Sequence, residues 1–156
     1  ICNMTHLKIG DLAPSFLELN QNGENVSLLD YKDKNLILYF YPKDNTPGCT
    51  AESCNLNANY SVLIKNGFAV LGVSPDTQIS HQKFINKYDL SFNLIADTQK
   101  KICKDYGVWG EKKFMGKTYV GVHRTTFIIS KNQIIEKIFH KVNTKSHAQQ
   151  ILESYK

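Results

Sequence analysis

The sequence predicts an α/β protein in which a central mixed β-sheet is flanked by helices. Two apolar runs, residues 35–41 and 68–74, are each followed by a segment with helical periodicity, which is typical of parallel strands joined by crossover helices. Residues 125–130 and 133–140 are apolar runs separated by only two residues, and they predict an antiparallel hairpin. Parallel and antiparallel pairs together make the predicted sheet mixed.

The first predicted element in chain order is an N-terminal β-hairpin within residues 15–28. Two short runs of alternating apolar and polar residues surround Asn22-Gly23, a dipeptide that favours tight turns between antiparallel strands. Residues 35–41 (NLILYFY) follow, and they are apolar at nearly every position. We therefore expect a strand buried on both faces, preceded by a hairpin extension.

A helix is predicted to follow this strand directly. Thr46 is suited to the N-cap and Pro47 to the first helical position. The predicted apolar stripe of this helix runs to Asn66-Gly67 and consists of Ala51, Cys54, Ala58 and Val62, with Leu63 as a further candidate. The order is therefore strand, short loop and helix.

Three further helices are predicted. They cover residues 77–88, residues 98–108 with an end at Gly107, and residues 146–155 with Ser146 as the N-cap. This order of elements is that of the thioredoxin-like fold, and the sequence has neither repeats nor a linker. We expect one domain over residues 1–156, with residues 1–6 as a flexible N-terminal segment.

Composition narrows the class of protein. The chain has 156 residues, of which 42% are hydrophobic and 21% charged, as in ordinary folded proteins rather than disordered or fibrous ones. Its longest apolar run, Leu36 to Tyr41, is far shorter than the roughly 20 residues that cross a bilayer, so no membrane association is expected. The net charge of +5 comes from dispersed lysines, which favours a solvated surface over a specific nucleic-acid site.

Cysteine usage indicates the compartment. Four cysteines without a dense disulfide framework, and without Cys/His pairs at zinc-finger spacing, are typical of an intracellular reducing compartment. Because residue 1 is Ile rather than Met, we expect that a preceding segment has been removed. Cytosol, nucleus and organelle therefore stay open.

Cys49 is the strongest candidate for a reactive group. It falls in the first turn of the helix that follows a central strand, at the sheet edge where ligands gather in open α/β folds. Free backbone N–H groups and the positive end of the helix dipole favour a thiolate there. The alternative is a buried cysteine that packs as a small hydrophobic residue.

The spacing of Cys49 and Cys54 predicts a two-step thiol chemistry. On an intact helix, positions five apart lie about 140° around the axis and about 8.6 Å apart at Cα. A disulfide needs less than about 7 Å, so the bond can form only if the helix unwinds. Peroxide would convert Cys49 to a sulfenic acid, which Cys54 would then capture as a disulfide. The alternative for Cys54 is packing with Ala51 and Ala58.

Two segments carry a resemblance to a known family. Residues 40–54 (FYPKDNTPGCTAESC) contain the pattern Pro-x-x-x-Thr-x-x-Cys as Pro42, Thr46 and Cys49, and residues 106–129 (YGVWGEKKFMGKTYVGVHRTTFII) form the second segment. With them, the chain resembles the peroxiredoxins of the Q-type, bacterioferritin-comigratory-protein-like group. The similarity extends from about Leu7 to Tyr155.

The resemblance implies a thiol-dependent peroxidase that reduces hydrogen peroxide and organic hydroperoxides without a bound cofactor or metal. It implies that Cys49 is the peroxidatic cysteine and Cys54 the resolving cysteine. Thr46 and Arg124 would contact the peroxide, as a hydroxyl and a permanent cation can, and Pro42 would shield the sulfur from water. The intramolecular disulfide would be reduced by a thioredoxin- or glutaredoxin-like partner, and the protein would be a monomer.

Other notable side chains receive structural interpretations. Glu52 is expected to be a pairing partner rather than a catalyst, and Cys103 a core residue. Cys2 is assigned no role. Trp109 is expected to anchor its loop, and His123 to help shape the pocket beside Arg124.

Two alternative functions share the predicted scaffold. A general dithiol-disulfide oxidoreductase is disfavoured because the chain lacks a Cys-x-x-Cys motif. A copper- or zinc-binding assembly factor could use Cys49, Cys54 and a histidine as ligands.

Overall fold

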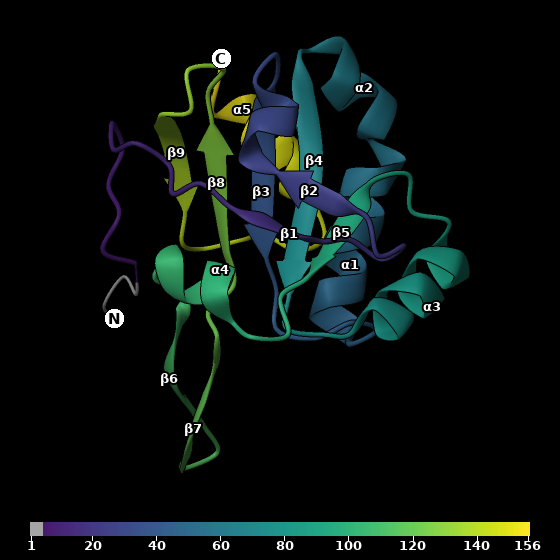
Figure 1. Ribbon diagram of the computed structural model, residues 1–156, viewed down its shortest axis with the longest axis vertical. Coiled ribbons are helices and arrows are strands. Elements are labelled where there is room, and N and C mark those ends of the chain that lie inside the picture. Colours follow the sequence, from purple (N-terminus) through teal and green to yellow (C-terminus); the bar gives the residue numbers. More distant parts are fainter. Residues whose placement is uncertain (1–4) are drawn as a thin grey trace.

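The computed structural model describes residues 5–156. Cys2 and most of the predicted flexible segment lie outside this range. A five-stranded sheet forms the centre of the fold, with the strand order β5-β4-β3-β8-β9 (Figure 1). The strands are β3 (Asn35–Phe40), β4 (Phe68–Ser74), β5 (Asn93–Ala96), β8 (Thr125–Ile129) and β9 (Ile135–Phe139).

The sheet is mixed, as predicted. β3 pairs in parallel with β4, and β4 with β5, whereas β8 is antiparallel to both β3 and β9. The predicted N-terminal hairpin is confirmed by β1 (Leu17–Leu19) and β2 (Asn25–Ser27), which pair antiparallel around Gly23 at φ +74°. The predicted fold class is therefore confirmed.

Side chains of β3 enter two cores, one on each face of the sheet. Leu36, Leu38 and Phe40 pack with the β1–β2 region and with α4 (Lys101–Asp105). Ile37, Tyr39 and Tyr41 pack on the opposite face. The helices that cover this second face are α1 (Pro47–Ala58), α2 (Tyr60–Lys65), α3 (Gln78–Tyr88) and α5 (His147–Glu153). A short 3₁₀ helix, η1 (Leu28–Tyr31), follows β2.

The helix predicted from Thr46 to Asn66 is interrupted at Asn59. This residue has φ −104° and ψ 12°, and it separates α1 from α2. Its side-chain amide Nδ2 donates to the carbonyl of Asn55 at 2.9 Å, which gives the backbone a local alternative to the helical pattern. The prediction of one continuous helix was therefore wrong, because the segment forms two helices separated by Asn59.

The predicted apolar stripe of α1 was also wrong. The buried face of α1 consists of Cys49, Glu52, Ser53 and Leu56, whereas Ala58 is exposed and Cys54 is half-buried. Two of the buried side chains are polar, and their burial is compensated by internal hydrogen bonds. Glu52 accepts from Arg124, and Ser53 is hydrogen-bonded to Tyr39. Packing of Cys54 with Ala58 on a buried stripe is thus excluded.

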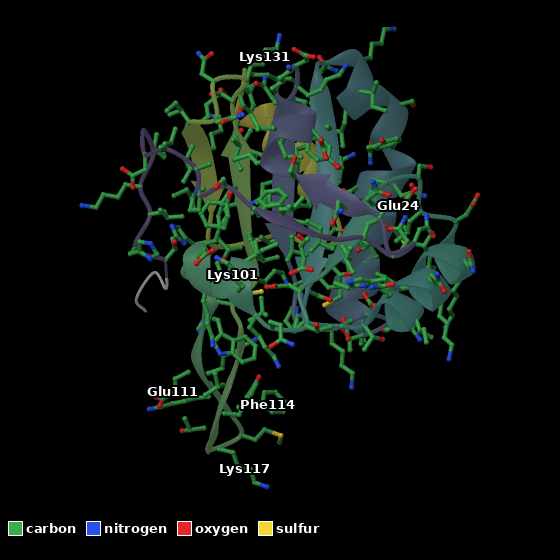
Figure 2. The ribbon with its side chains drawn as sticks, viewed as in Figure 1. Glu24, Lys101, Glu111, Phe114, Lys117 and Lys131 are labelled. Atoms are coloured by element: carbon green, nitrogen blue, oxygen red, sulfur yellow. The ribbon has the colours of Figure 1, made fainter. Side chains whose placement is uncertain are left out.

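The sequence analysis did not identify three strands. One is β5, and the others are β6 (Trp109–Phe114) and β7 (Lys117–Val122), which form a separate two-stranded hairpin. This hairpin extends away from the rest of the fold, and the side chains of Phe114 and Lys117 lie near its tip (Figures 1 and 2). At its base, half-buried Trp109 packs against the core, as expected for an anchor.

Within residues 5–156, no helix has the length and apolar character that a membrane crossing would need.

Candidate active site

Cys49 lies at the start of α1, immediately beyond the carboxyl end of β3. Thr46 is the N-cap, Pro47 occupies the first helical position, and Cys49 is only 1% exposed. The first N–H groups of a helix have no partner within it, so they present a positive field to a side chain at this position. The local sequence therefore places the sulfur where a thiolate is favoured.

Arg124 adds a full positive charge beside this sulfur. It lies in the connection between β7 and β8, and its Nη2 donates to Cys49 Sγ at 3.3 Å. The approach depends on Gly48, because a Cβ at that position would lie 3.1 Å from Arg124 Nη2. Gly48 and Cys49 at the start of α1 and the distant Arg124 thus form a compact anion site.

Glu52 holds the same guanidinium from the other side. Its Oε1 accepts from Arg124 Nη1 at 2.7 Å, so the predicted pairing role of Glu52 is confirmed. Burial raises the pKa of Glu52 to about 7, although the positive charge of Arg124 opposes this change. Among the described residues, Oε2 of Glu52 has no hydrogen-bond partner.

His147 of α5 is a neighbour of Glu52 that sequence reasoning did not identify. Its Nε2 lies 3.7 Å from Glu52 Oε2 and 2.8 Å from Thr126 Oγ1. Burial lowers the pKa of His147 to about 4, so the ring is neutral at pH 7. Because Nδ1 faces the side-chain oxygen of Gln150 at 2.9 Å, Nδ1 carries the proton and Nε2 accepts from Thr126.

Pro42 and Thr46 lie on the loop that joins β3 to α1. Both are half-buried, and the Thr46 hydroxyl donates to the carbonyl of Lys43 at 2.8 Å. Thr46 therefore caps α1 through its backbone position but not through its side chain, which differs from the usual N-cap arrangement. Neither residue has a hydrogen bond to Cys49 among the described contacts.

Cys54 lies in the same uninterrupted helix as Cys49, and both thiols are free. Burial raises the pKa of the half-buried Cys54 thiol, which favours its protonated form while α1 is folded. Cys103 is fully buried, as predicted for a core residue, and burial raises the pKa of its thiol strongly. Its sulfur is consequently inert by comparison with Cys49.

Metal binding through the cysteines finds no support in residues 5–156. Within that range, Asp44, Asp76 and His81 are the one group of three or more candidate ligands whose ligand atoms lie within 4.8 Å of one another. The group contains neither Cys49 nor Cys54. It also lacks His123, whose Nε2 instead lies 2.9 Å from the carbonyl of Glu111 in β6.

Comparisons with known proteins agree with this geometry. Residues 9–138 match the model of the AhpC/TSA family. Peroxiredoxin Bcp of Escherichia coli K12 is 44% identical over 149 residues, which is 96% of each chain. The structure of a PrxQ cysteine-to-serine mutant from Xylella fastidiosa superposes with a TM-score of 0.90, at 32% identity and over 97% of this chain and 96% of that one.

A third similar structure is that of the Xanthomonas campestris bacterioferritin comigratory protein. Its TM-score is 0.83 at 32% identity, and 96% of each chain is covered. The structures of that protein include a trapped intermediate and ligand complex and concern its alkyl peroxide reduction activity.

The chain therefore belongs to the AhpC/TSA family, and it is a peroxiredoxin. Its similarity to Bcp and PrxQ proteins over nearly its whole length assigns it to the Q-type, bacterioferritin-comigratory-protein-like group. This confirms the resemblance predicted from residues 40–54 and 106–129. Peroxiredoxins are thiol peroxidases, so the family assignment favours peroxidase chemistry over both alternative functions.

Proposed function

We propose that this peroxiredoxin reduces hydrogen peroxide and organic hydroperoxides through Cys49, and that Cys54 resolves the oxidised sulfur within the same chain. The observation that carries the proposal is the donation from Arg124 Nη2 to Cys49 Sγ at 3.3 Å, at the N-terminus of α1. A permanent cation and a helix N-terminus together stabilise a thiolate, which is the nucleophilic form of cysteine.

In the first step the Cys49 thiolate attacks the terminal oxygen of the hydroperoxide. The O–O bond breaks, Cys49 becomes a sulfenic acid, and the departing oxygen takes a proton to leave as water or an alcohol. Negative charge moves from sulfur to oxygen during this step, and Arg124 is positioned to stabilise it. The Thr46 hydroxyl would orient the peroxide, and Pro42, which has no N–H, would limit access of water.

In the second step the Cys54 thiol condenses with the sulfenic acid and releases water. The two residues occupy one continuous helix, on which their separation of about 8.6 Å exceeds disulfide geometry. The first turns of α1 must therefore unwind before the bond forms. Unwinding also exposes Cys54, which removes the burial that favours its protonated form.

The Cys49–Cys54 disulfide would be reduced by a thioredoxin- or glutaredoxin-like protein. Such a partner attacks one sulfur with its own thiolate, forms a mixed disulfide and leaves both cysteines reduced. We expect the protein to act as a monomer, because the complete chemistry requires only residues of one chain. We expect an intracellular reducing compartment, because the chain has few cysteines and no dense disulfide framework.

The test is peroxide consumption by the purified protein with dithiothreitol or with a thioredoxin system as reductant. Cys49→Ser should abolish consumption, whereas Cys103→Ser, the matched control at a buried cysteine outside the site, should retain it. Cys54→Ser should keep turnover with dithiothreitol and lose it with thioredoxin. Full turnover by Cys49→Ser would overturn the proposal, and insulin reduction without peroxide consumption would favour a general dithiol oxidoreductase.

A further inference from the structure

The loop between β3 and α1 contains a buried acid whose role the steps above do not use. Asp44 is 7% exposed, although its neighbours Lys43 and Asn45 are exposed. The same loop carries Pro42 and Thr46. A carboxylate is rarely buried unless several donors compensate for its lost hydration.

Asp44 has such donors on both its side chain and its backbone. Its Oδ1 accepts from the Tyr41 hydroxyl at 2.6 Å, and its Oδ2 accepts from the Ser80 hydroxyl at 2.8 Å. Its backbone N–H donates to Asp76 Oδ2 at 2.8 Å. Asp44 therefore fixes the loop both to the segment that follows β4 and to α3.

His81 of α3 supplies the remaining contact of Asp44, and the same ring also contacts the central sheet. Nδ1 lies 2.7 Å from Asp44 Oδ2, and Nε2 lies 2.9 Å from the carbonyl of Ile95 in β5. A backbone carbonyl only accepts, so Nε2 must carry a proton. Nδ1 and Oδ2 must then share one further proton, because two bare lone pairs at 2.7 Å would repel.

Burial makes this pair difficult to replace. The His81 side chain is 0% exposed and that of Asp44 is 4% exposed, so water has no access to compensate a lost partner. Buried charged or proton-sharing pairs contribute little net stability compared with apolar packing, and they are better suited to fixing one conformation. The conformation fixed here is that of the loop that leads from β3 into α1 and Cys49.

We propose that Asp44 and His81 are positioning residues of the peroxide reaction, which tie residues 42–46 to α3 and β5 and so hold Pro42 and Thr46 in place. This inference rests on the proposed function of Cys49.

The test measures the first step alone, in a Cys54→Ser background, by quenched-flow mass spectrometry of the Cys49 peptide after addition of hydrogen peroxide. Displacing a positioning group by about 1 Å can cost about 100-fold in rate. Asp44→Asn is therefore expected to slow Cys49 oxidation by about 10- to 100-fold. Tyr41→Phe removes only the Oδ1 hydrogen bond and is expected to slow it several-fold, which gives a milder variant should Asp44→Asn fail to fold.

Two substitutions of His81 by an amide side chain distinguish its contact with Asp44 from its contact with Ile95. In His81→Asn the amide nitrogen takes the place of Nδ1 and can still donate to Asp44, whereas in His81→Gln it takes the place of Nε2 and reaches Ile95 instead. We expect His81→Asn to stay within about threefold of the parent rate and His81→Gln to fall at least tenfold below it. Asp97→Asn is the matched control, since Asp97 is a buried carboxylate that binds backbone N–H groups of α4 and does not touch the loop.

Thermal stability is measured for every variant in parallel. Parent-like rates in folded Asp44→Asn and His81→Gln would overturn the positioning role alone. Equal slowing by His81→Asn, His81→Gln and Asp97→Asn, in proportion to lost stability, would also overturn it. If the parent protein itself is not oxidised at Cys49, the proposed function fails first.

Discussion

Glu52 and His147 are predicted to give the stability of this protein two opposite pH dependences. Burial raises the pKa of Glu52 from 4.5 to about 7, with Arg124 opposing the change, and burial lowers the pKa of His147 from 6.5 to about 4. Each difference of about 2.5 in pKa corresponds to about 3 kcal/mol at about 1.4 kcal/mol per pKa unit. Both side chains are fully buried, so solvent screening does not reduce these values greatly.

The sign of each pH dependence follows from whether the folded or the unfolded state binds the proton. Between about pH 4.5 and 7 the folded state holds a proton on Glu52 that the unfolded state has released, so the free energy of unfolding falls as pH rises. Between about pH 4 and 6.5 the unfolded state binds a proton on His147 that the folded state does not, so the free energy of unfolding rises with pH. The two contributions cancel over the shared window in the wild-type protein.

Single substitutions should reveal each contribution. In urea unfolding of the reduced protein from pH 4.5 to 6.5, Glu52→Gln should gain about 3 kcal/mol relative to wild type as pH rises, and His147→Asn should lose a similar amount. The double variant serves as the control and should be parallel to wild type. If the free energy of unfolding of each single variant changes with pH in parallel with that of wild type, Glu52 and His147 are not the source of the two pH dependences.

Three further predictions concern the reaction itself. Arg124→Gln removes a charge-assisted hydrogen bond to Cys49 worth about 1.5–3 kcal/mol, so Cys49 oxidation should slow by about 10- to 150-fold in quenched-flow experiments; an unchanged rate would contradict the role of Arg124. Gly48→Ala puts a Cβ 3.1 Å from Arg124 Nη2 and should slow the same step several-fold with an unchanged circular dichroism spectrum. Amide hydrogens of residues 49–54 should exchange faster in the disulfide form than in the reduced form, and equal protection would exclude unwinding of α1.

The central elements of the fold could be predicted from sequence because their signals are local. β3 and β4 are continuous apolar runs, and their observed bounds agree with residues 35–41 and 68–74 within one residue. β5 has only four residues, which is too short for a periodic pattern to appear. The β6–β7 hairpin was missed because its turn consists of Met115-Gly116, both at positive φ, and Met is not a residue typical of that conformation.

The candidate site could be predicted only in part. Cys49 is indicated by its place at a helix start, whereas Arg124 lies 75 residues away and was assigned through the family resemblance alone. His147 and the Asp44–His81 pair gave no usable signal, because each acts through contacts between distant segments. The buried face of α1 was misjudged for the same reason, since the partners of buried Glu52, Arg124 and His147, come from distant segments.

The most direct measurement is peptide mass spectrometry of the reduced protein after one equivalent of hydrogen peroxide. We predict a disulfide linking the Cys49 and Cys54 peptides, and in Cys54→Ser a dimedone adduct on Cys49, while Cys103 stays reduced in both. Oxidation that spares Cys49, or that leaves it unable to pair with Cys54, would contradict peroxide reduction through this cysteine pair.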